Sequence, residues 1–95
     1  MVYAYGNIIV SAPEQLAAYR EKAADALNRH QGRVVSASPK QTVIEGDFGE
    51  TGIGVLLEFP TAQDAKNWIT DPDLQSTHDL RRAAGQSNIV IIGEL

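Results

Sequence analysis

The chain has 95 residues, of which 43% are hydrophobic and 21% are charged, and its formal net charge at pH 7 is -4. Length and composition favour one globular domain, residues 1–95, over a disordered chain. The negative charge argues against nucleic acid and anionic membranes as partners, because both require a basic surface. The chain has no cysteine, which excludes disulfides and thiolate metal sites. Since it shows neither an apolar run of about 20 residues nor a signal-peptide pattern, we expect a cytoplasmic protein.

A strand and a long helix are predicted at the start of the chain. Residues 3–10 are rich in aromatic and β-branched side chains, which is typical of a strand. Ser11, Pro13 and Glu14 then match a helix start with Ser11 as the N-cap, and the helix extends to about Gln31. Apolar side chains that recur at helical spacing should form its buried stripe. They are Leu16, Tyr19, Ala23, Ala26, Leu27 and His30.

The region after this helix contains two segments with strand character. Gly32 suits the left-handed position after the last helical turn. Residues 33–38 and 41–46 are interpreted as one kinked strand, or as a small hairpin around Pro39-Lys40. A glycine-rich turn at residues 47–52 then leads into the centre of the chain.

The central stretch is a strand followed directly by a helix. Residues 53–59 are almost entirely apolar and predict a buried strand. Pro60 ends the strand because it has no N–H for a sheet ladder, and Thr61, three residues before Asp64, begins a helix. The helix pauses after Trp68.

The last third of the chain completes the pattern. Asp71 and Pro72 begin a final helix that extends to about Ala84 and ends at Gly85, and residues 88–92 form the closing strand. The order is strand, helix, strand, strand, helix pair, strand. This order predicts an α+β protein with the ferredoxin-like βαββαβ arrangement, a four-stranded antiparallel sheet with its helices on one face.

Alternation along the central strand predicts that both faces of the sheet are apolar. Ile53, Val55, Leu57 and Phe59 share one face, whereas Leu56 and Glu58 share the other. The closing strand is apolar on both sides as well, and helices can cover only one face. We therefore expect a homodimer in which a second copy of the chain covers the open face.

Five short motifs resemble those of one protein family. They are Ile44-Glu45-Gly46-Asp47-Phe48, Leu57-Glu58-Phe59-Pro60, Ala65-Lys66-Asn67-Trp68, Asp71-Pro72-Asp73 and Leu80-Arg81. The chain resembles domain of unknown function family 1330 over nearly its whole length. The resemblance implies a dimeric α+β barrel, in which two ferredoxin-like sheets face each other, but no established reaction. The wider superfamily is similar in fold to small cofactor-free monooxygenases and muconolactone-type isomerases.

The chain departs from this family at three places. The family usually carries a glycine pair where Gln31-Gly32 stands, an arginine where residues 36–38 offer none, and a tyrosine at the position of Leu74. If those groups shape a ligand site in relatives, the site in this chain is altered or smaller.

Glu58 is the first candidate for chemistry. A carboxylate within an apolar strand must find a cationic or hydrogen-bonding partner or act as a base. Arg81, which matches the family's arginine, is the expected partner, either in a buried pair that orients helix and sheet or in a ligand site. His78 lies three residues before Arg81 on the same helical face and could shuttle a proton near neutral pH, or it could be partly exposed without a function.

Three further residues are candidate ligand contacts. Tyr19 and Trp68 could line a pocket or belong to the core or a dimer contact, and Glu45 lies beside a turn where it could also be only solvated. His30 and His78 are far apart in the sequence and have no third ligand at a useful spacing, so no metal site is expected. We find no dinucleotide loop and expect no cofactor.

Two functions and a structural role remain open. The preferred hypothesis is a homodimer that binds a small apolar or aromatic molecule between sheet and helices. The alternative is a cofactor-independent enzyme, monooxygenase- or isomerase-like, acting on a carbonyl or phenolic substrate. Glu58 or His78 would then move the proton, and Arg81 would stabilise an enolate-like anion. That enzyme requires Glu58 or His78 to reach a cavity of roughly a few hundred Å³, whereas the structural role expects no cavity.

Overall fold

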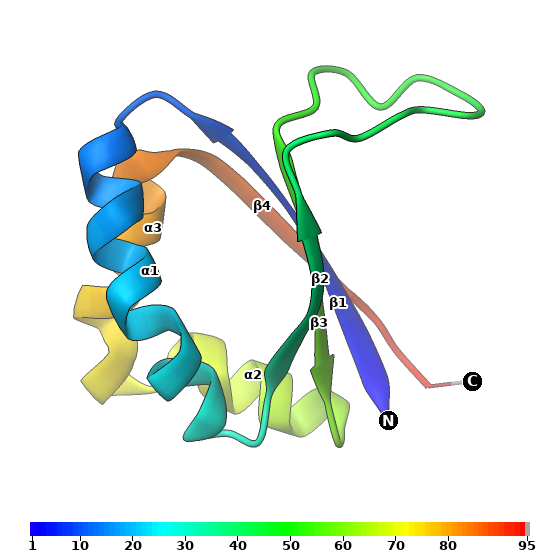
Figure 1. Ribbon diagram of the computed structural model, residues 1–95. Helices are drawn as coiled ribbons and strands as arrows, with labels where there is room; N and C mark the ends of the chain where they lie inside the picture. The colour runs from blue at the N-terminus through cyan, green and yellow to red at the C-terminus, as the bar shows by residue number, and fades with distance from the viewer. Residues whose placement is uncertain (95) are drawn as a thin grey trace.

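The computed structural model describes residues 1–94, which form a four-stranded antiparallel sheet with its helices on one face (Figure 1). The strand order is β2-β3-β1-β4. This is the ferredoxin-like arrangement that the sequence predicts. The elements are β1 (Val2–Val10), α1 (Pro13–Asn28), β2 (Arg33–Ser38), β3 (Ile53–Phe59), α2 (Ala62–Thr70), the 3₁₀ turn η1 (Pro72–Leu74), α3 (Gln75–Ala84) and β4 (Gly85–Ile92).

The predicted unit of central strand and helix is confirmed. β3 ends at Phe59, and the Thr61 hydroxyl accepts a hydrogen bond from the Asp64 backbone N–H at 3.1 Å, so Thr61 is the N-cap of α2. The Asp71 carboxylate likewise accepts from the Asp73 N–H at 2.9 Å and caps η1, which leads directly into α3. Short-range capping therefore sets both helix starts.

The predicted start of α1 is wrong in its detail. Ala12, not Ser11, occupies the N-cap position, and no side chain caps this helix. The backbone N–H groups of Ser11 and Ala12 instead both donate to the Ala84 carbonyl at 2.9 Å. The start of α1 is thus held by the end of α3, a tertiary contact that replaces the local cap.

The end of α1 also differs from the prediction. The helix stops at Asn28, and Gln31 (φ 61°), not Gly32, takes the left-handed conformation. The Gly32 N–H donates to the Leu27 carbonyl at 2.9 Å and the Gln31 N–H to that of Asn28 at 3.1 Å, which is a Schellman motif. Gly32 is required for space, because a Cβ there would lie 2.5 Å from Cε1 of Phe59.

The second predicted strand segment, residues 41–46, is a loop in the structure. The Gln41 side chain anchors this loop: its Nε2 donates to Asn7 Oδ1 at 2.6 Å and to the Gly52 carbonyl at 3.0 Å, while its Oε1 accepts from the Tyr5 hydroxyl. These side-chain bonds replace a strand ladder. The loop between β2 and β3 projects from the upper edge of the sheet on the side away from the helices (Figure 1).

The core lies between the sheet and the helices. It consists of Val2, Ala4, Ala26, Leu27, Leu57, Phe59, Ala65, Trp68 and Leu74. Leu16, Ala26 and Leu27 of the predicted α1 stripe are buried, whereas the other three members are half-buried. The Phe59 and Trp68 rings pack at 5.6 Å between centroids and join β3 to α2.

The outer face of the sheet is apolar as well. Strand register places Tyr3 opposite Ile92 and Tyr5 opposite Val90 on this face. Tyr3, Val90 and Ile92 are all exposed in the single chain. The predicted two-sided apolar sheet is therefore present. Among the described helices, none combines the length and the apolar character needed to cross a bilayer.

Candidate functional site

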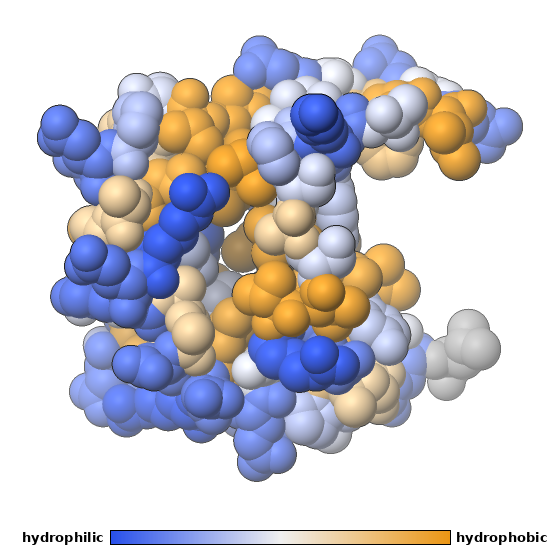
Figure 2. Space-filling model, in the orientation of Figure 1, coloured by the Kyte–Doolittle hydropathy of each residue, from blue (hydrophilic) through white to orange (hydrophobic). Residues whose placement is uncertain are grey.

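A cavity of about 160 Å³ lies between the helix-facing side of the sheet and the three α-helices. Figure 2 shows a hollow near the centre of the molecule, with apolar side chains above and below it and hydrophilic side chains on its left. A cavity of roughly 150 Å³ holds one benzene ring, so the space suits a single aromatic ring or a short branched chain. It is smaller than the few hundred Å³ expected for the enzyme.

The floor of the cavity is built from helix-facing positions of all four strands. These are Gly6, Ile8, Val34, Ala37, Ile53, Val55, Leu57 and Ile89. Gly6 leaves space because it has no side chain, and a Cβ there would meet only Ile89 Cγ1 at 3.6 Å. Sequence reasoning missed Gly6, although a glycine inside a strand can mark close approach of a ligand.

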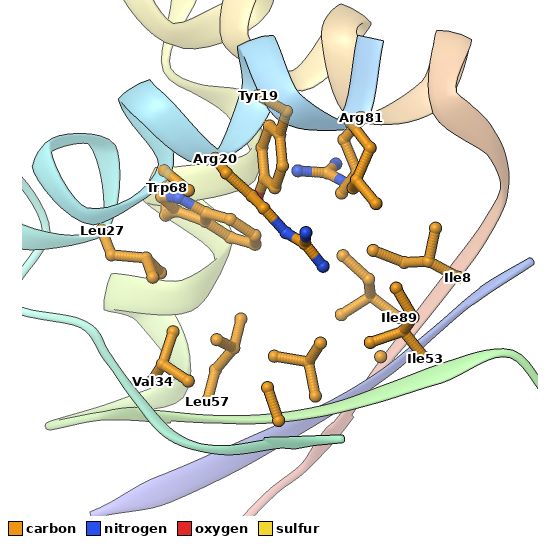
Figure 3. Close-up of a pocket in the computed structure, with 15 residues that line it drawn as sticks. Ile8, Tyr19, Arg20, Leu27, Val34, Ile53, Leu57, Trp68, Arg81 and Ile89 are labelled. Atoms are coloured by element: carbon orange, nitrogen blue, oxygen red, sulfur yellow. The ribbon is translucent and has the colours of Figure 1, made fainter. Parts of the chain in front are cut away.

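The helices supply the polar groups. Tyr19, Arg20, Trp68 and Arg81 line the cavity, and no aspartate or glutamate of residues 1–94 does. In the close-up, the guanidinium groups of Arg20 and Arg81 lie on the helix side, across from the aliphatic side chains of the strands (Figure 3). Of the sequence candidates, Tyr19, Trp68 and Arg81 thus meet at one place, while Arg20 was missed because nothing in the local pattern distinguishes it from a solvated helix residue.

Arg81 is only 3% exposed. Its Nη1 donates to His78 Nδ1 at 2.8 Å, and its Nε donates to the Ser87 hydroxyl at 3.3 Å. The guanidinium carbon lies 5.5 Å from the centroid of the Tyr19 ring and 5.4 Å from that of Trp68, within cation–π range. These contacts hold the cation against the cavity wall with neutral partners.

His78 is fully buried behind Trp68 and Arg81. Because Arg81 can only donate, His78 Nδ1 accepts, and the proton is on Nε2, which donates to the Trp68 carbonyl at 2.8 Å. Burial lowers the pKa of His78 and the nearby Arg81 charge lowers it further, against an opposing effect of the Trp68 carbonyl. His78 is therefore neutral, and it is not among the residues that line the cavity.

The predicted pairing of Glu58 with Arg81 is wrong. Glu58 follows the inward-facing Leu57, so its side chain leaves the sheet on the opposite side from α3. There it forms an ion pair with Arg33, which lies directly across on β2, with 2.9 Å between Nε and Oε1. Strand register, which the sequence does not show, determines this partner.

Glu45 lies in the exposed loop between β2 and β3 and does not line the cavity. Among residues 1–94, no group of three or more His, Asp and Glu side chains is placed to hold a metal ion. Trp68 Nε1 is buried and has no hydrogen-bond partner in the described part of the chain.

Comparison with solved structures shows the same fold in several proteins. A protein of unknown function from Rhodopseudomonas palustris has a TM-score of 0.75 at 19% identity, over 99% of this chain and 82% of that one. A dimeric ferredoxin-like protein of unknown function from Jannaschia sp. CCS1 has a TM-score of 0.67 at 14% identity, over 98% of both chains. SnoaB, a cofactor-independent oxygenase from Streptomyces nogalater, has a TM-score of 0.62 at 12% identity, over 99% of this chain and 91% of the SnoaB chain.

Sequence comparison identifies the family. No curated protein matches the chain. Residues 1–95 match the family described as Domain of unknown function (DUF1330), in agreement with the motifs around Glu45, Glu58 and Arg81. Since the match covers the full length, the chain belongs to the DUF1330 family.

Proposed function

We propose that the protein binds a small apolar or aromatic molecule in the cavity between the sheet and the helices. The observation that carries this proposal is the cavity itself, which has aliphatic side chains on the strand side and a few polar groups on the helix side. Concave apolar sites with a few convergent polar groups are typical of small-molecule binding. The purely structural role, which expects no cavity, is disfavoured for the same reason.

The test uses Gly6. Gly6→Leu places a side chain in the cavity and should abolish the binding of single-ring probes such as benzyl alcohol and benzoate. Trp68 is the only tryptophan, so its fluorescence and its indole N–H resonance report on the cavity. Gly93→Leu is the matched control, because among residues 1–94 no atom other than those of its chain neighbours lies within 4 Å of a Cβ at that position. Unchanged probe binding in Gly6→Leu, or none in the unsubstituted protein, would contradict the proposal.

We also propose that a second copy of the chain covers the outer face of the sheet. Tyr3, Val90 and Ile92 expose apolar surface there, and in the adjacent loop Ile44 is 96% exposed. The Jannaschia protein of this fold is described as dimeric, and so is a similar protein from Bacteroides fragilis. Light scattering should give a dimer mass that the double variant Val90→Lys, Ile92→Lys converts to a monomer.

The control for the dimer is Ala24→Lys on the exposed side of α1. It adds a charge of the same kind away from the sheet and should leave the mass unchanged. A concentration of about 100 μM is well above the dissociation constants of stable homodimers. A monomer mass for the unsubstituted protein at this concentration would refute the proposed homodimer.

Cofactor-independent proton transfer on a carbonyl or phenolic substrate is the second candidate. The buried cation of Arg81 at the cavity favours it, because such a group could stabilise an enolate-like anion. However, Glu58 lies on the opposite face of the sheet and His78 is sealed, so neither proposed base opens into the cavity. Binding without chemistry is therefore preferred. Exchange of the α-protons of acetophenone into D₂O, measured by NMR, should be no faster with the protein than with buffer alone.

A further inference from the structure

We infer that the ligand of the cavity carries a negative charge, that it is a small aromatic or branched aliphatic carboxylate, and that Arg81 binds its carboxylate group. The inference rests on the proposed function, since it names the class of molecule that the same cavity takes. It depends on three observations: the burial of Arg81 without a counter-charge, the charge of the cavity lining, and the size and apolar character of the space.

Arg81 differs from the other arginines that have a defined partner. Arg29, Arg33 and Arg82 have side chains 50%, 64% and 47% exposed, and each forms an ion pair with a carboxylate. Arg81, at 3% exposure, forms none with any carboxylate of residues 1–94. Buried charges in proteins are normally paired, because removing an ion from water is costly. Arg20 also has no ion pair among residues 1–94, but it is exposed, so Arg81 is the arginine that most needs a counter-charge.

Arg81 lines the cavity and has hydrogen-bonding capacity that the described residues do not use. Nε and Nη1 are engaged by Ser87 and His78, whereas Nη2 has no hydrogen-bond partner among residues 1–94. The guanidinium cannot lose its proton to escape the cost of burial. His78 is a neutral acceptor and supplies no negative charge. A ligand oxygen in the cavity would complete the coordination of Arg81.

The remaining lining carries the same sign of charge. Arg20 also lines the cavity, and none of the aspartates or glutamates in the described part of the chain does, although the protein as a whole has a net charge of -4. Figure 3 shows the two guanidinium groups on the same side of the space. Arg20 is an exposed residue and Arg81 a buried one, so the buried charge of Arg81 makes the main contribution. A lining with this sign of charge attracts an anion and disfavours a cation.

The rest of the cavity determines the other half of the ligand. Its strand side is aliphatic, with side chains such as Ile8, Ile53 and Leu57, and its volume of about 160 Å³ suits one ring. An inorganic anion would satisfy Arg81 and leave this apolar space empty. A carboxylate matches the planar guanidinium, and an attached ring or short branched chain fills the space.

The experiment compares benzoate with benzamide, which have nearly the same shape and differ in charge. We expect benzoate to bind the unsubstituted protein at least about tenfold more tightly, as a charge-assisted hydrogen bond to a buried cation implies. Affinity is measured from the Trp68 indole N–H shift in NMR titrations at constant ionic strength. Arg81→Gln should remove the preference for benzoate and retain weak binding of benzamide, while Arg82→Gln, on the exposed side of the same helix, should keep the preference.

Three other outcomes would each overturn the inference in a distinguishable way. Equal binding of benzoate and benzamide would refute the charge requirement and leave the proposed function standing. Equal shifts of the Trp68 resonance with sodium phosphate would indicate an anion site without an apolar component. Binding of neither ring compound would refute both the inference and the proposed function. If Arg81→Gln does not fold, the comparison in the unsubstituted protein and in Arg82→Gln still decides.

Discussion

Gly32→Ala should destabilise the protein because it forces a methyl group into the aromatic core. A Cβ at this position would lie 2.5, 2.8 and 3.0 Å from three carbons of the Phe59 ring. Phe59 is completely buried, and its ring packs on Trp68. Trp68 is held in turn by the edge of His78, with 4.8 Å between ring centroids. The Phe59 ring therefore cannot move away from residue 32 without displacing the Trp68 and His78 rings.

The expected loss is about 1.3 kcal/mol, within a range of about 0–2.6 kcal/mol. Overpacking in a core costs about 1–3 kcal/mol. Replacing glycine by alanine returns about 0.4–1 kcal/mol by restricting the unfolded chain. For a domain of this size a net loss of about 1.3 kcal/mol corresponds to a fall in melting temperature of about 5–10 °C. Urea unfolding followed by circular dichroism, at equal protein concentration, measures the free energy directly.

Gly6→Ala is the matched control for Gly32→Ala. It makes the same chemical change in a strand where the new Cβ meets only Ile89 Cγ1, at an ordinary 3.6 Å. Its free energy of unfolding should rise by about 0.4–1 kcal/mol, because the unfolded chain is restricted in the same way and no clash offsets the gain. If Gly32→Ala has the same free energy of unfolding as this control, the Phe59 ring can move aside at little cost, and the argument from close packing fails.

Stability should fall as the pH decreases below about 6.5, because the folded-state pKa of His78 is lowered by burial and the unfolded chain takes up the proton first. In urea unfolding at pH 7 and 5.5, the free energy of unfolding of His78→Gln should fall less than that of the unsubstituted protein. An identical fall in both proteins would contradict the assignment to His78. A second loss is expected below about pH 3.8, since hydrogen bonds from His30 and the Asp73 N–H lower the pKa of Asp71 in the folded state; unfolding at pH 4.5 and 3 measures it. Thr61→Ala removes the N-cap of α2 and should cost about 1 kcal/mol by urea unfolding, whereas no change would mean that tertiary contacts alone hold the helix start. Gln31→Gly should raise the free energy of unfolding by about 0.5–1 kcal/mol, because glycine adopts the left-handed conformation of this position without strain; a decrease would show that the Gln31 side chain contributes more than its backbone costs.

The sequence alone determined the order and type of nearly every element. Alternation showed the two faces of β3, and the Thr61 cap and the Asp71-Pro72 step located the helices that follow. These features depend on neighbours within a few positions, so periodicity and capping chemistry are sufficient to predict them. The same local reasoning brought His78 and Arg81 to one helical face, where they are hydrogen-bonded.

Only the tertiary structure decided the partners of these side chains. Glu58 pairs with Arg33 and not with Arg81, because the register between β2 and β3 and the direction of a strand side chain decide which cation it can reach. The Gln41 side chain replaces the expected strand by bonding to Asn7, 34 positions away. The cavity is lined by residues of all four strands and three helices, among them Gly6, which has no side chain to fill it. Its charge arises because the fold buries Arg81 away from every described carboxylate. Such contacts join residues that are distant in the chain, and their geometry is set only when sheet and helices pack together.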